Sequence, residues 1–414
     1  MQNATSPSAI ADPNLLIDAV PGKDAHSWSW PAPALAEQDR RTFLKTVSLP
    51  CFAACAAACL ERFAIPVQAA SLTEDESRFR VEARFYHKLP GKVVECGLCP
   101  RQCVVVNGER GHCGVRENRG GTYYSLVHSR VCTAHMDPVE KKPFFHFYPG
   151  SLAFSIATGG CNVNCKFCQN WEISQARPEQ LRATYLPPKQ LAEAARQNQC
   201  PLLAYTYSEP TVFSEYLLDA AEAGRAAGLK SVVVSNGFIR QEPLKEMCRS
   251  VDGIKTDLKS FSPKYYQEVV NGELKPVLDT LVTIHKEGTW NEIVYLVVPT
   301  LNDSDGEFRD LARWIKSELG VEVPIHFTRF FPLYLLKNLP PTPQETLERA
   351  KAIADAEGLH YVYIGNVPGH SAENTYCPKC RTLLIERAGF TIAQMNLRKG
   401  KCPKCQHAIP GRWK

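Results

Sequence analysis

From about residue 151 onward the chain alternates short β-rich runs with helical segments, and this alternation restricts the fold more than any other feature. Seven runs are expected to form strands: residues 152–157, 202–207, 231–234, 253–258, 292–298, 325–330 and, as an addition to the first six, 361–364. Ser262-Pro263 and Thr342-Pro343-Gln344-Glu345 are typical helix starts between them, the second with a capping box. Repeated strand-helix units favour an α/β fold with a parallel sheet, whose carboxyl strand ends carry the chemistry.

Three cysteines follow the first expected strand directly. Cys161, Cys165 and Cys168 have the spacing C-x3-C-x2-C. Soft thiolates suit iron-sulfur clusters, and three of them leave the fourth corner of an iron-sulfur cube without a protein ligand. An open position at a metal can bind a small molecule. A structural zinc site or free thiols are the alternative for these three residues taken alone.

This loop resembles the signature of the radical S-adenosylmethionine (SAM) superfamily, which has an aromatic residue before its last cysteine, here Phe167. The resemblance implies a partial (β/α)6 barrel and a 4Fe-4S cluster whose unique iron chelates the amino and carboxylate groups of SAM. It further implies that an electron from a donor such as ferredoxin or flavodoxin cleaves SAM. The products are methionine and a 5'-deoxyadenosyl radical that abstracts hydrogen from a substrate.

Companion residues at later strand ends extend the resemblance. Glu209, in Tyr207-Ser208-Glu209-Pro210, occupies the place of the family's Gly-Gly-Glu-Pro motif, which receives the SAM amino group. Two further strand ends resemble the glycyl-radical activating enzymes, relatives of the pyruvate formate-lyase activase. There the resemblance implies contacts to SAM from Ser235, Asn236, Asp257 and Lys259, although Val234 replaces an aspartate of that family. For each residue alone, satisfying the local backbone is an equal alternative.

His326 lies on the sixth expected strand. It could act at the cofactor site as an acid, a base or a hydrogen-bond donor. The other reading is a core histidine whose ring nitrogens are satisfied by neighbours. The sequence assigns no catalytic residue.

Two cysteine modules flank the expected barrel. Cys96, Cys99, Cys103 and Cys113 can close a four-thiolate site, with structural zinc preferred over a second cluster. A second set, spaced as in a zinc ribbon or a rubredoxin-like iron site, consists of Cys377, Cys380, Cys402 and Cys405. In so short a module the metal would supply much of the folding free energy.

Residues 96–413 together resemble one subgroup, the radical SAM protein of the AmmeMemoRadiSam system. The resemblance is carried by the segment from Cys96 to Cys113, the cluster loop and three further segments: Asp137-Pro138-Val139-Glu140-Lys141-Lys142-Pro143, Phe147-Tyr148-Pro149-Gly150 and Gly365-Asn366-Val367-Pro368-Gly369-His370. It implies association with the partner proteins of that system and supplies no substrate. The Asp137 segment is a loop over the active site or a simple turn.

The chain of 414 residues is expected to divide into a disordered leader (1–70), a Cys-rich module (71–150), a radical SAM core (151–370) and a zinc-ribbon-like module (371–414). Arg40-Arg41-Thr42-Phe43-Leu44-Lys45 in the leader resembles a twin-arginine export signal. Export to the periplasm or a membrane face and retention in the cytoplasm both stay open, and membrane contact is expected only through the leader. A net charge of +5 without longer basic runs predicts no nucleic-acid partner.

The leading hypothesis is therefore an enzyme that reductively cleaves SAM and abstracts hydrogen from a protein or peptide, with a glycyl-radical enzyme as one such substrate. The alternative is a zinc-binding, iron-sulfur or electron-transfer protein that recruits a partner without cleaving SAM.

Overall fold

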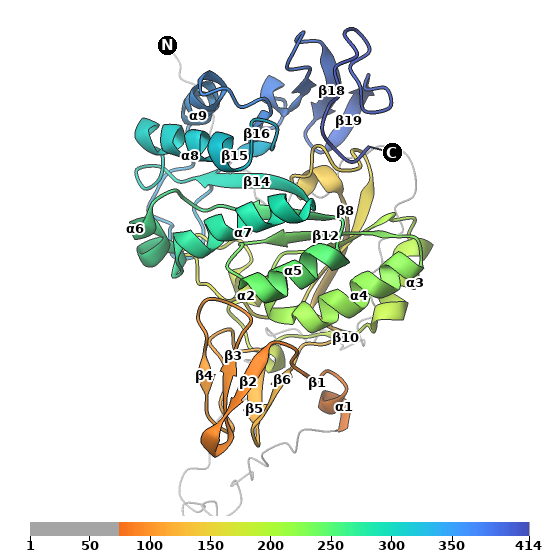
Figure 1. Ribbon diagram of the computed structural model, residues 1–414, viewed down its shortest axis with the longest axis vertical. Coiled ribbons are helices and arrows are strands. Elements are labelled where there is room, and N and C mark those ends of the chain that lie inside the picture. The colour runs from red at the N-terminus through yellow and green to blue at the C-terminus, as the bar shows by residue number, and fades with distance from the viewer. Residues whose placement is uncertain (1–73, 414) are drawn as a thin grey trace, which may run out of the picture. The chain divides into compact units, whose positions relative to one another are not determined.

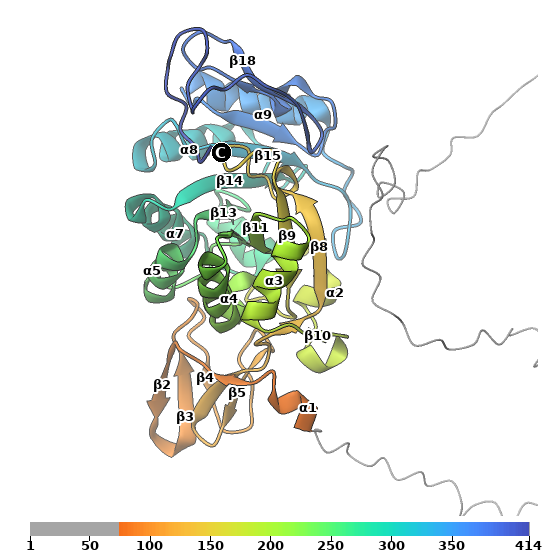
Figure 2. The ribbon, with the colours of Figure 1, turned by 90° about the vertical axis from the view of Figure 1, so that its right-hand side faces the viewer.

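A central eight-stranded sheet organises the chain (Figures 1 and 2). The structure is a computed structural model that describes residues 74–413, so the leader with its Arg40-Arg41 pair lies outside the described residues. The strand order is β16-β15-β14-β13-β12-β11-β9-β8. The parallel strands are β9 (Leu152–Ala157), β11 (Leu202–Tyr205), β12 (Lys230–Ser235), β13 (Gly253–Asp257), β14 (Trp290–Val297), β15 (Ile325–Arg329) and β16 (Val362–Gly365).

All seven runs predicted from the alternation are therefore strands of one parallel sheet, and the mixed α/β class is confirmed. β11 ends two residues earlier than expected. Its extension stops because Tyr207 adopts a left-handed backbone conformation with φ 65°. The edge strand β8 (Thr133–Pro138) was not predicted, and it pairs antiparallel with β9.

Helices connect the parallel strands and bury one apolar face each. In α8, for example, Ser304 accepts a hydrogen bond from the Glu307 backbone at the start, and Phe308, Leu311 and Ile315 are buried. The long helices are α3 (Pro188–Gln197), α4 (Ser214–Ala226), α5 (Gln241–Ser250), α7 (Leu274–Glu287), α8 (Asp305–Glu318) and α9 (Gln344–Ala356). Three helices are short: α1 (Glu74–Ser77), α2 (Trp171–Ser174) and α6 (Pro263–Tyr265). The helix α6 continues as a π-helix (Tyr266–Val270).

The two helix starts predicted from proline-containing motifs have different outcomes. Ser262 caps α6 as expected, because its hydroxyl accepts from the Tyr265 backbone. The capping box at Thr342 is wrong. The Thr342 hydroxyl is buried, where it donates to the Val297 carbonyl and accepts from the Phe330 backbone, so it is not available to α9.

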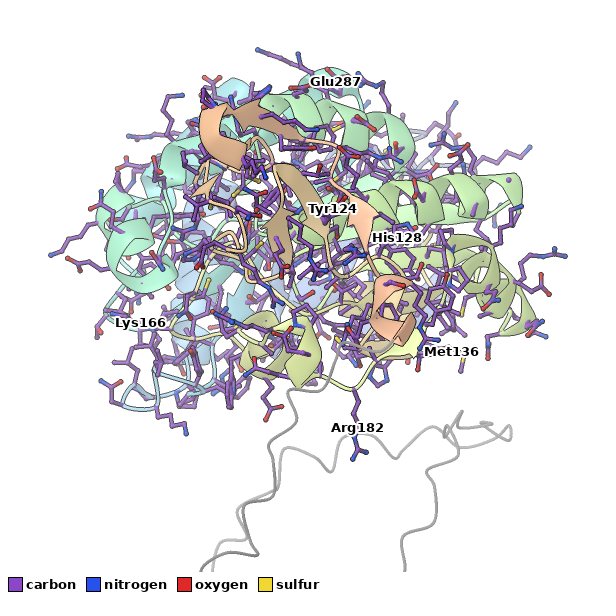
Figure 3. The ribbon with its side chains drawn as sticks, turned by 90° about the horizontal axis from the view of Figure 1, so that it is seen from below. Tyr124, His128, Met136, Lys166, Arg182 and Glu287 are labelled. Atoms are coloured by element: carbon purple, nitrogen blue, oxygen red, sulfur yellow. The ribbon has the colours of Figure 1, made fainter. Side chains whose placement is uncertain are left out.

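Small antiparallel sheets precede and follow the central sheet. The first group contains β1 (Val81–Glu82), β2 (Tyr86–Leu89), β3 (Val93–Cys96), β4 (Val104–Val105), β5 (Arg116–Arg119) and β6 (Thr122–Ser125). Figure 3 looks onto this end of the molecule, with Tyr124 and His128 labelled. The other strands are β7 (Arg130–Val131), which pairs with β10 (Thr184–Tyr185), and, near the C-terminus, β17 (Thr375–Tyr376), β18 (Leu383–Ala388) and β19 (Thr391–Met395).

A buried ion pair joins the first group of strands to the sheet unit. Arg116 of β5 and Glu215 of α4 are 0% and 2% exposed and form a salt bridge. The Arg116 guanidinium also donates to the Val212 carbonyl and the Ser214 hydroxyl. Removing either partner would strand a buried charge, which makes this contact specific as well as strong. Within residues 74–413, no helix is long and apolar enough to cross a lipid bilayer.

Candidate functional site

The cluster loop leaves the carboxyl end of β9 and is pinned by its backbone. The Asn164 and Lys166 amides donate to the carbonyls of Val270 and Val269, at the end of the π-helix. Gly160 has φ 96°, and a Cβ there would lie 2.5 Å from a Val115 methyl carbon, so glycine is required on both counts. These contacts fix the path of the loop backbone before and within the cysteine motif.

The three loop thiols can serve as ligands of a cluster. Cys165 is buried, and Cys161 and Cys168 are partly buried. Three thiolates leave one corner of an iron-sulfur cube without a protein ligand. Burial raises the pKa of Cys165 to about 12 and that of Cys161 well above its usual value, so a metal must displace the thiol protons.

Glu209 lies beside this loop in a buried network of hydrogen bonds. Its Oε1 accepts from the Thr211 backbone and the Ser235 hydroxyl, and its Oε2 accepts from the Asn236 backbone at 2.8 Å. A carboxylate offers about four acceptor positions, so Oε2 retains one. Burial raises the pKa of Glu209, while these hydrogen bonds act in the opposite direction. The structure thus brings Glu209, Ser235 and Asn236 together.

Asn236 connects that network to the loop. Its side-chain nitrogen lies 3.7 Å from the Cys161 sulfur and 2.8 Å from the Asn162 side-chain oxygen. The Asn236 side-chain oxygen accepts from the Phe238 backbone, which fixes the amide orientation. The ends of β9, β11 and β12 therefore meet at one place.

Asp257 and Lys259 form a charged cluster on the next strand. The Asp257 carboxylate pairs with Lys255 and with Lys259, the latter at 2.8 Å. Burial acts to raise the pKa of Asp257, but the two lysines outweigh it and hold it at about 2. Lys259 lies over the Phe167 ring of the loop at 5.9 Å, so this pair also borders the cysteines.

The structure places His326 away from these contacts. Its Nε2 lies 2.8 Å from Glu292, and its ring stacks on Tyr363 and meets Phe145 edge-on. Glu292 in turn accepts from the Phe145 and His146 backbones. These are the contacts of a histidine in the interior, and burial lowers its pKa.

Sequence reasoning did not identify a second polar cluster built around Tyr207. Its hydroxyl donates to Asp137, and Lys142 pairs with the same carboxylate and lies 4.3 Å from the ring centre. Asp137 lies near the amino end of β9, opposite Ala153, so the Tyr207 side chain reaches back along the sheet. Burial lowers the pKa of Lys142 to about 8. The Asp137 segment was noted only as a loop or a turn.

Replacing Asp137 by asparagine is expected to lower the free energy of unfolding at pH 7 by about 3 to 5 kcal/mol, because Lys142 would lose a buried partner. The pKa of Asp137 is held below its usual value: burial opposes this, and Lys142 outweighs it. Asp137 therefore stabilises the fold above about pH 4, and this contribution is lost as the pH falls further. Urea unfolding between pH 7 and 2.5 should show a flatter dependence in the variant.

The matched control is Asp279→Asn, which removes an exposed i,i+4 pair with Lys275 and should cost under about 1 kcal/mol. An equal pH dependence of the free energy of unfolding in wild type and Asp137→Asn would show that the Asp137 carboxylate does not stabilise the fold.

The C-terminal cysteines form a close-packed set. Among residues 74–413, Cys377, Cys380, Cys402 and Cys405 are the one group of three or more potential metal ligands whose donor atoms all lie within 4.8 Å of one another. The Cys377-Cys405 and Cys380-Cys402 sulfur distances are both 3.6 Å. This matches the spacing of about 3.8 Å around one tetrahedral zinc. These residues can hold a metal ion.

The N-terminal cysteines share one cavity. Cys96, Cys99, Cys103 and Cys113 line it, together with Arg116 and Tyr123 among others.

The model of the Radical SAM superfamily matches residues 155–315, which include the cluster loop and the strand ends described above. The uncharacterized protein MJ0808 of Methanocaldococcus jannaschii is 44% identical over 330 residues, covering 79% of this chain and 98% of that protein. Residues 155–315 therefore form a domain of the Radical SAM superfamily. Proteins of this superfamily use a 4Fe-4S cluster and SAM, and Cys161, Cys165 and Cys168 supply the three thiols that such a cluster needs.

Two further matches are more distant. The pyruvate formate-lyase-activating enzyme of Clostridium pasteurianum is 24% identical over 165 residues, covering 39% of this chain and 69% of that protein. Among solved structures, a domain of the pyruvate-formate lyase-activating enzyme of Bacteroides vulgatus matches with a TM-score of 0.36 and 18% identity. That match covers 39% of this chain and 98% of the other.

Proposed function

We propose that this radical SAM protein cleaves SAM reductively and uses the resulting radical to abstract hydrogen from a protein or peptide. The observation that carries the proposal is the position of Asn236, whose amide contacts the Cys161 thiol and whose backbone donates to Glu209. A cluster ligand and a carboxylate for the SAM ammonium thus lie on either side of one residue. When bound, a 4Fe-4S cluster supplies the electron and the open iron position that SAM cleavage requires.

The chain's own residues have separate parts in this scheme. Cys161, Cys165 and Cys168 hold three irons, and Glu209 Oε2 accepts a proton of the SAM ammonium group. Ser235 and the Asn236 backbone fix the orientation of that carboxylate. Lys259 and Asp257 provide a neutralised charge pair beside the loop for polar groups of SAM. Glu209 is buried, so water is largely excluded from its contacts and they are strengthened.

An exposed apolar surface next to the cluster loop supports a macromolecular substrate. The Leu335 backbone donates to the Lys166 carbonyl, which places the segment after β15 against the loop. Its side chains Phe331, Leu333 and Leu335 are 44%, 37% and 58% exposed. Trp171, at the other end of the loop, stacks on Tyr334 of the same segment. Contiguous exposed apolar residues mark protein interaction sites.

Five finer assignments belong to this proposal. The strands β9 to β15 with their helices form a partial (β/α)6 barrel, within a core of residues 151–370. The module of residues 371–414 is a zinc ribbon, and residues 71–150 form an N-terminal Cys-rich module whose last strand, β8, joins the central sheet. The partners are proteins of the AmmeMemoRadiSam system and a donor such as ferredoxin or flavodoxin. A glycyl-radical enzyme is one substrate of the proposed class.

The test is anaerobic reconstitution with iron and sulfide, followed by incubation with SAM and dithionite. The proposal predicts 5'-deoxyadenosine and methionine in equal amounts. A folded protein that carries the cluster and forms neither would overturn it. Anaerobic capture of the interacting protein, with mass analysis for a changed residue, then identifies the substrate.

Replacing Cys402 by serine should release the C-terminal metal. The module should then unfold, because metal binding supplies much of its folding free energy. Zinc analysis should show the loss of one ion per chain, and limited proteolysis should cut within residues 371–414. The control is Lys404→Ala, which changes a neighbour and keeps all four thiols. An intact, protease-resistant module in Cys402→Ser would disprove the zinc assignment.

A further inference from the structure

Four cysteine side chains of the N-terminal module surround one cavity. Cys96 and Cys99 are buried, and Cys103 and Cys113 are partly buried. Each therefore presents a thiol to the same small space. The set is complete, so a metal group bound there would need no further ligand.

The N-terminal set differs from the C-terminal set in its surroundings. In the C-terminal set, sulfurs lie 3.6 Å apart, close to the 3.8 Å or so that one tetrahedral ion requires. The N-terminal cysteines instead line a cavity together with Arg116, Tyr123 and Asn162, the last of which belongs to the cluster loop. We propose that Cys96, Cys99, Cys103 and Cys113 hold an iron-sulfur cluster, and that this cluster passes electrons to the cluster loop.

Buried hydrogen-bond donors line the same cavity. Arg116 Nη1 and the Tyr123 hydroxyl are buried and have no hydrogen-bond partner among the described residues. A cluster with four thiolates is anionic, and its sulfurs accept hydrogen bonds. The His112 backbone already donates to the Cys103 sulfur at 3.4 Å. At Gly111 a Cβ would lie 2.5 Å from the Tyr123 oxygen, so glycine keeps this donor in place.

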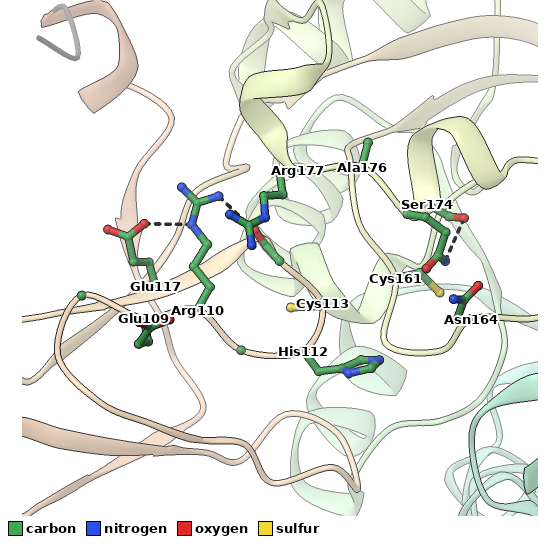
Figure 4. A pocket seen from close by; sticks show the side chains of 14 residues that line it. Glu109, Arg110, His112, Cys113, Glu117, Cys161, Asn164, Ser174, Ala176 and Arg177 are labelled. Atoms are coloured by element: carbon green, nitrogen blue, oxygen red, sulfur yellow. Dashed lines mark hydrogen bonds and ion pairs between the residues drawn. The ribbon is translucent and has the colours of Figure 1, made fainter. Parts of the chain in front are cut away.

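The N-terminal cysteines directly adjoin the cluster loop. Arg101, between Cys99 and Cys103, donates to the Asn162 carbonyl at 2.6 Å. A Cβ at Gly160 would lie 3.0 Å from the Cys113 carbonyl oxygen. Cys113 and Cys161 line one cavity of about 430 Å³, and Figure 4 shows both side chains at its edge. The two thiolate sets are thus neighbours, which is what a one-electron transfer between them needs.

The electron count balances without a further reactant. A low-potential one-electron donor of the ferredoxin or flavodoxin class is oxidised by one electron, and the N-terminal cluster is reduced by one. The N-terminal cluster then returns to its oxidised state as the loop cluster gains that electron. No bond forms or breaks in this step. The electron transfer between the two clusters rests on the proposed function, because SAM cleavage is the step that uses the electron. The identity of the N-terminal metal group does not rest on the proposed function.

Metal analysis of a Cys161→Ala, Cys165→Ala, Cys168→Ala triple variant tests the site directly. The expected result is about two or four irons per chain with an equal amount of sulfide, and one zinc. Its reduced form should give an electron paramagnetic resonance (EPR) signal that SAM does not change. Two zinc ions and no iron in a folded triple variant would overturn the proposal.

The relay is tested on a Cys96→Ala, Cys103→Ala variant, in which reduction of the loop cluster is followed without SAM. Reduction by reduced flavodoxin should lose its fast phase, while reduction by dithionite should keep its rate. Tyr123→Phe, which keeps all ligands, should shift the potential of the N-terminal cluster and leave that of the loop cluster unchanged. Equal rates with flavodoxin in wild type and variant would overturn the relay. Failure of the wild type to form 5'-deoxyadenosine would count against the proposed function alone.

Discussion

Replacing Cys165 by alanine is expected to remove the cluster from the loop and to reduce SAM cleavage to the detection limit. Cys165 is the most buried of the three loop thiols, and no other cysteine among residues 74–413 takes part in the loop. Two thiolates cannot hold three corners of a cluster, so the loss is complete and not graded. The measurement is the yield of 5'-deoxyadenosine per chain after anaerobic reconstitution, together with the iron content.

Cys248→Ala is the matched control. Cys248 is a buried thiol on α5 without a metal-ligand spacing, so its loss should leave iron and product yield unchanged. The account fails if Cys165→Ala retains wild-type product formation, or if Cys248→Ala abolishes it as well.

Glu209→Gln should weaken SAM binding about tenfold or more, since a hydrogen bond to a charged group contributes about 1.5 to 3 kcal/mol. The substitution preserves shape and removes the charge that attracts the SAM ammonium. It also places a side-chain amide opposite the groups that donate hydrogen bonds to Glu209. The free energy of unfolding should therefore fall by about 1 to 3 kcal/mol. Anaerobic calorimetry gives the Kd for SAM, and thermal unfolding gives the second quantity.

Ser235→Ala separates charge from hydrogen bonding. It removes one donor to Glu209 and leaves the carboxylate ionised, so SAM affinity should fall much less than in Glu209→Gln. Unchanged SAM affinity in Glu209→Gln would show that the ammonium group binds elsewhere.

The sequence predicted the sheet well because its signals are local. Apolar runs such as residues 292–298 are bounded by turns, and the helical spacing of Phe308, Leu311 and Ile315 lies between two such runs. Glu209 and Asn236 were singled out through the family resemblance, and their positions after neighbouring parallel strands agree with their meeting at one edge of the sheet.

Contacts that depend on edge pairing and burial were not predictable in this way. β8 adds to the sheet antiparallel, outside the alternation, and so the position of Asp137 opposite Ala153 had no sequence signal. Tyr207 stands where the family's Gly-Gly-Glu-Pro motif has a glycine. In the structure its hydroxyl donates a hydrogen bond to Asp137. The sequence around Thr342 matches a capping box. That pattern cannot show that the Thr342 hydroxyl donates to the Val297 carbonyl in the folded chain.

Cysteine spacing in the sequence likewise did not separate zinc from a cluster. Both flanking sets contain four thiols, and both satisfy the ligand count of either metal group. The distances between sulfurs depend on how the chain folds around each set, and two of them in the C-terminal set are 3.6 Å.

The central claim is that the cluster at Cys161, Cys165 and Cys168 keeps one iron open for SAM. The most direct measurement is the EPR spectrum of the reduced, reconstituted protein with and without SAM, recorded on the Cys96→Ala, Cys103→Ala variant so that one cluster is observed. The account predicts that SAM shifts the signal, and that Glu209→Gln in the same background needs more SAM for the same shift. A spectrum that saturating SAM leaves unchanged would contradict the claim.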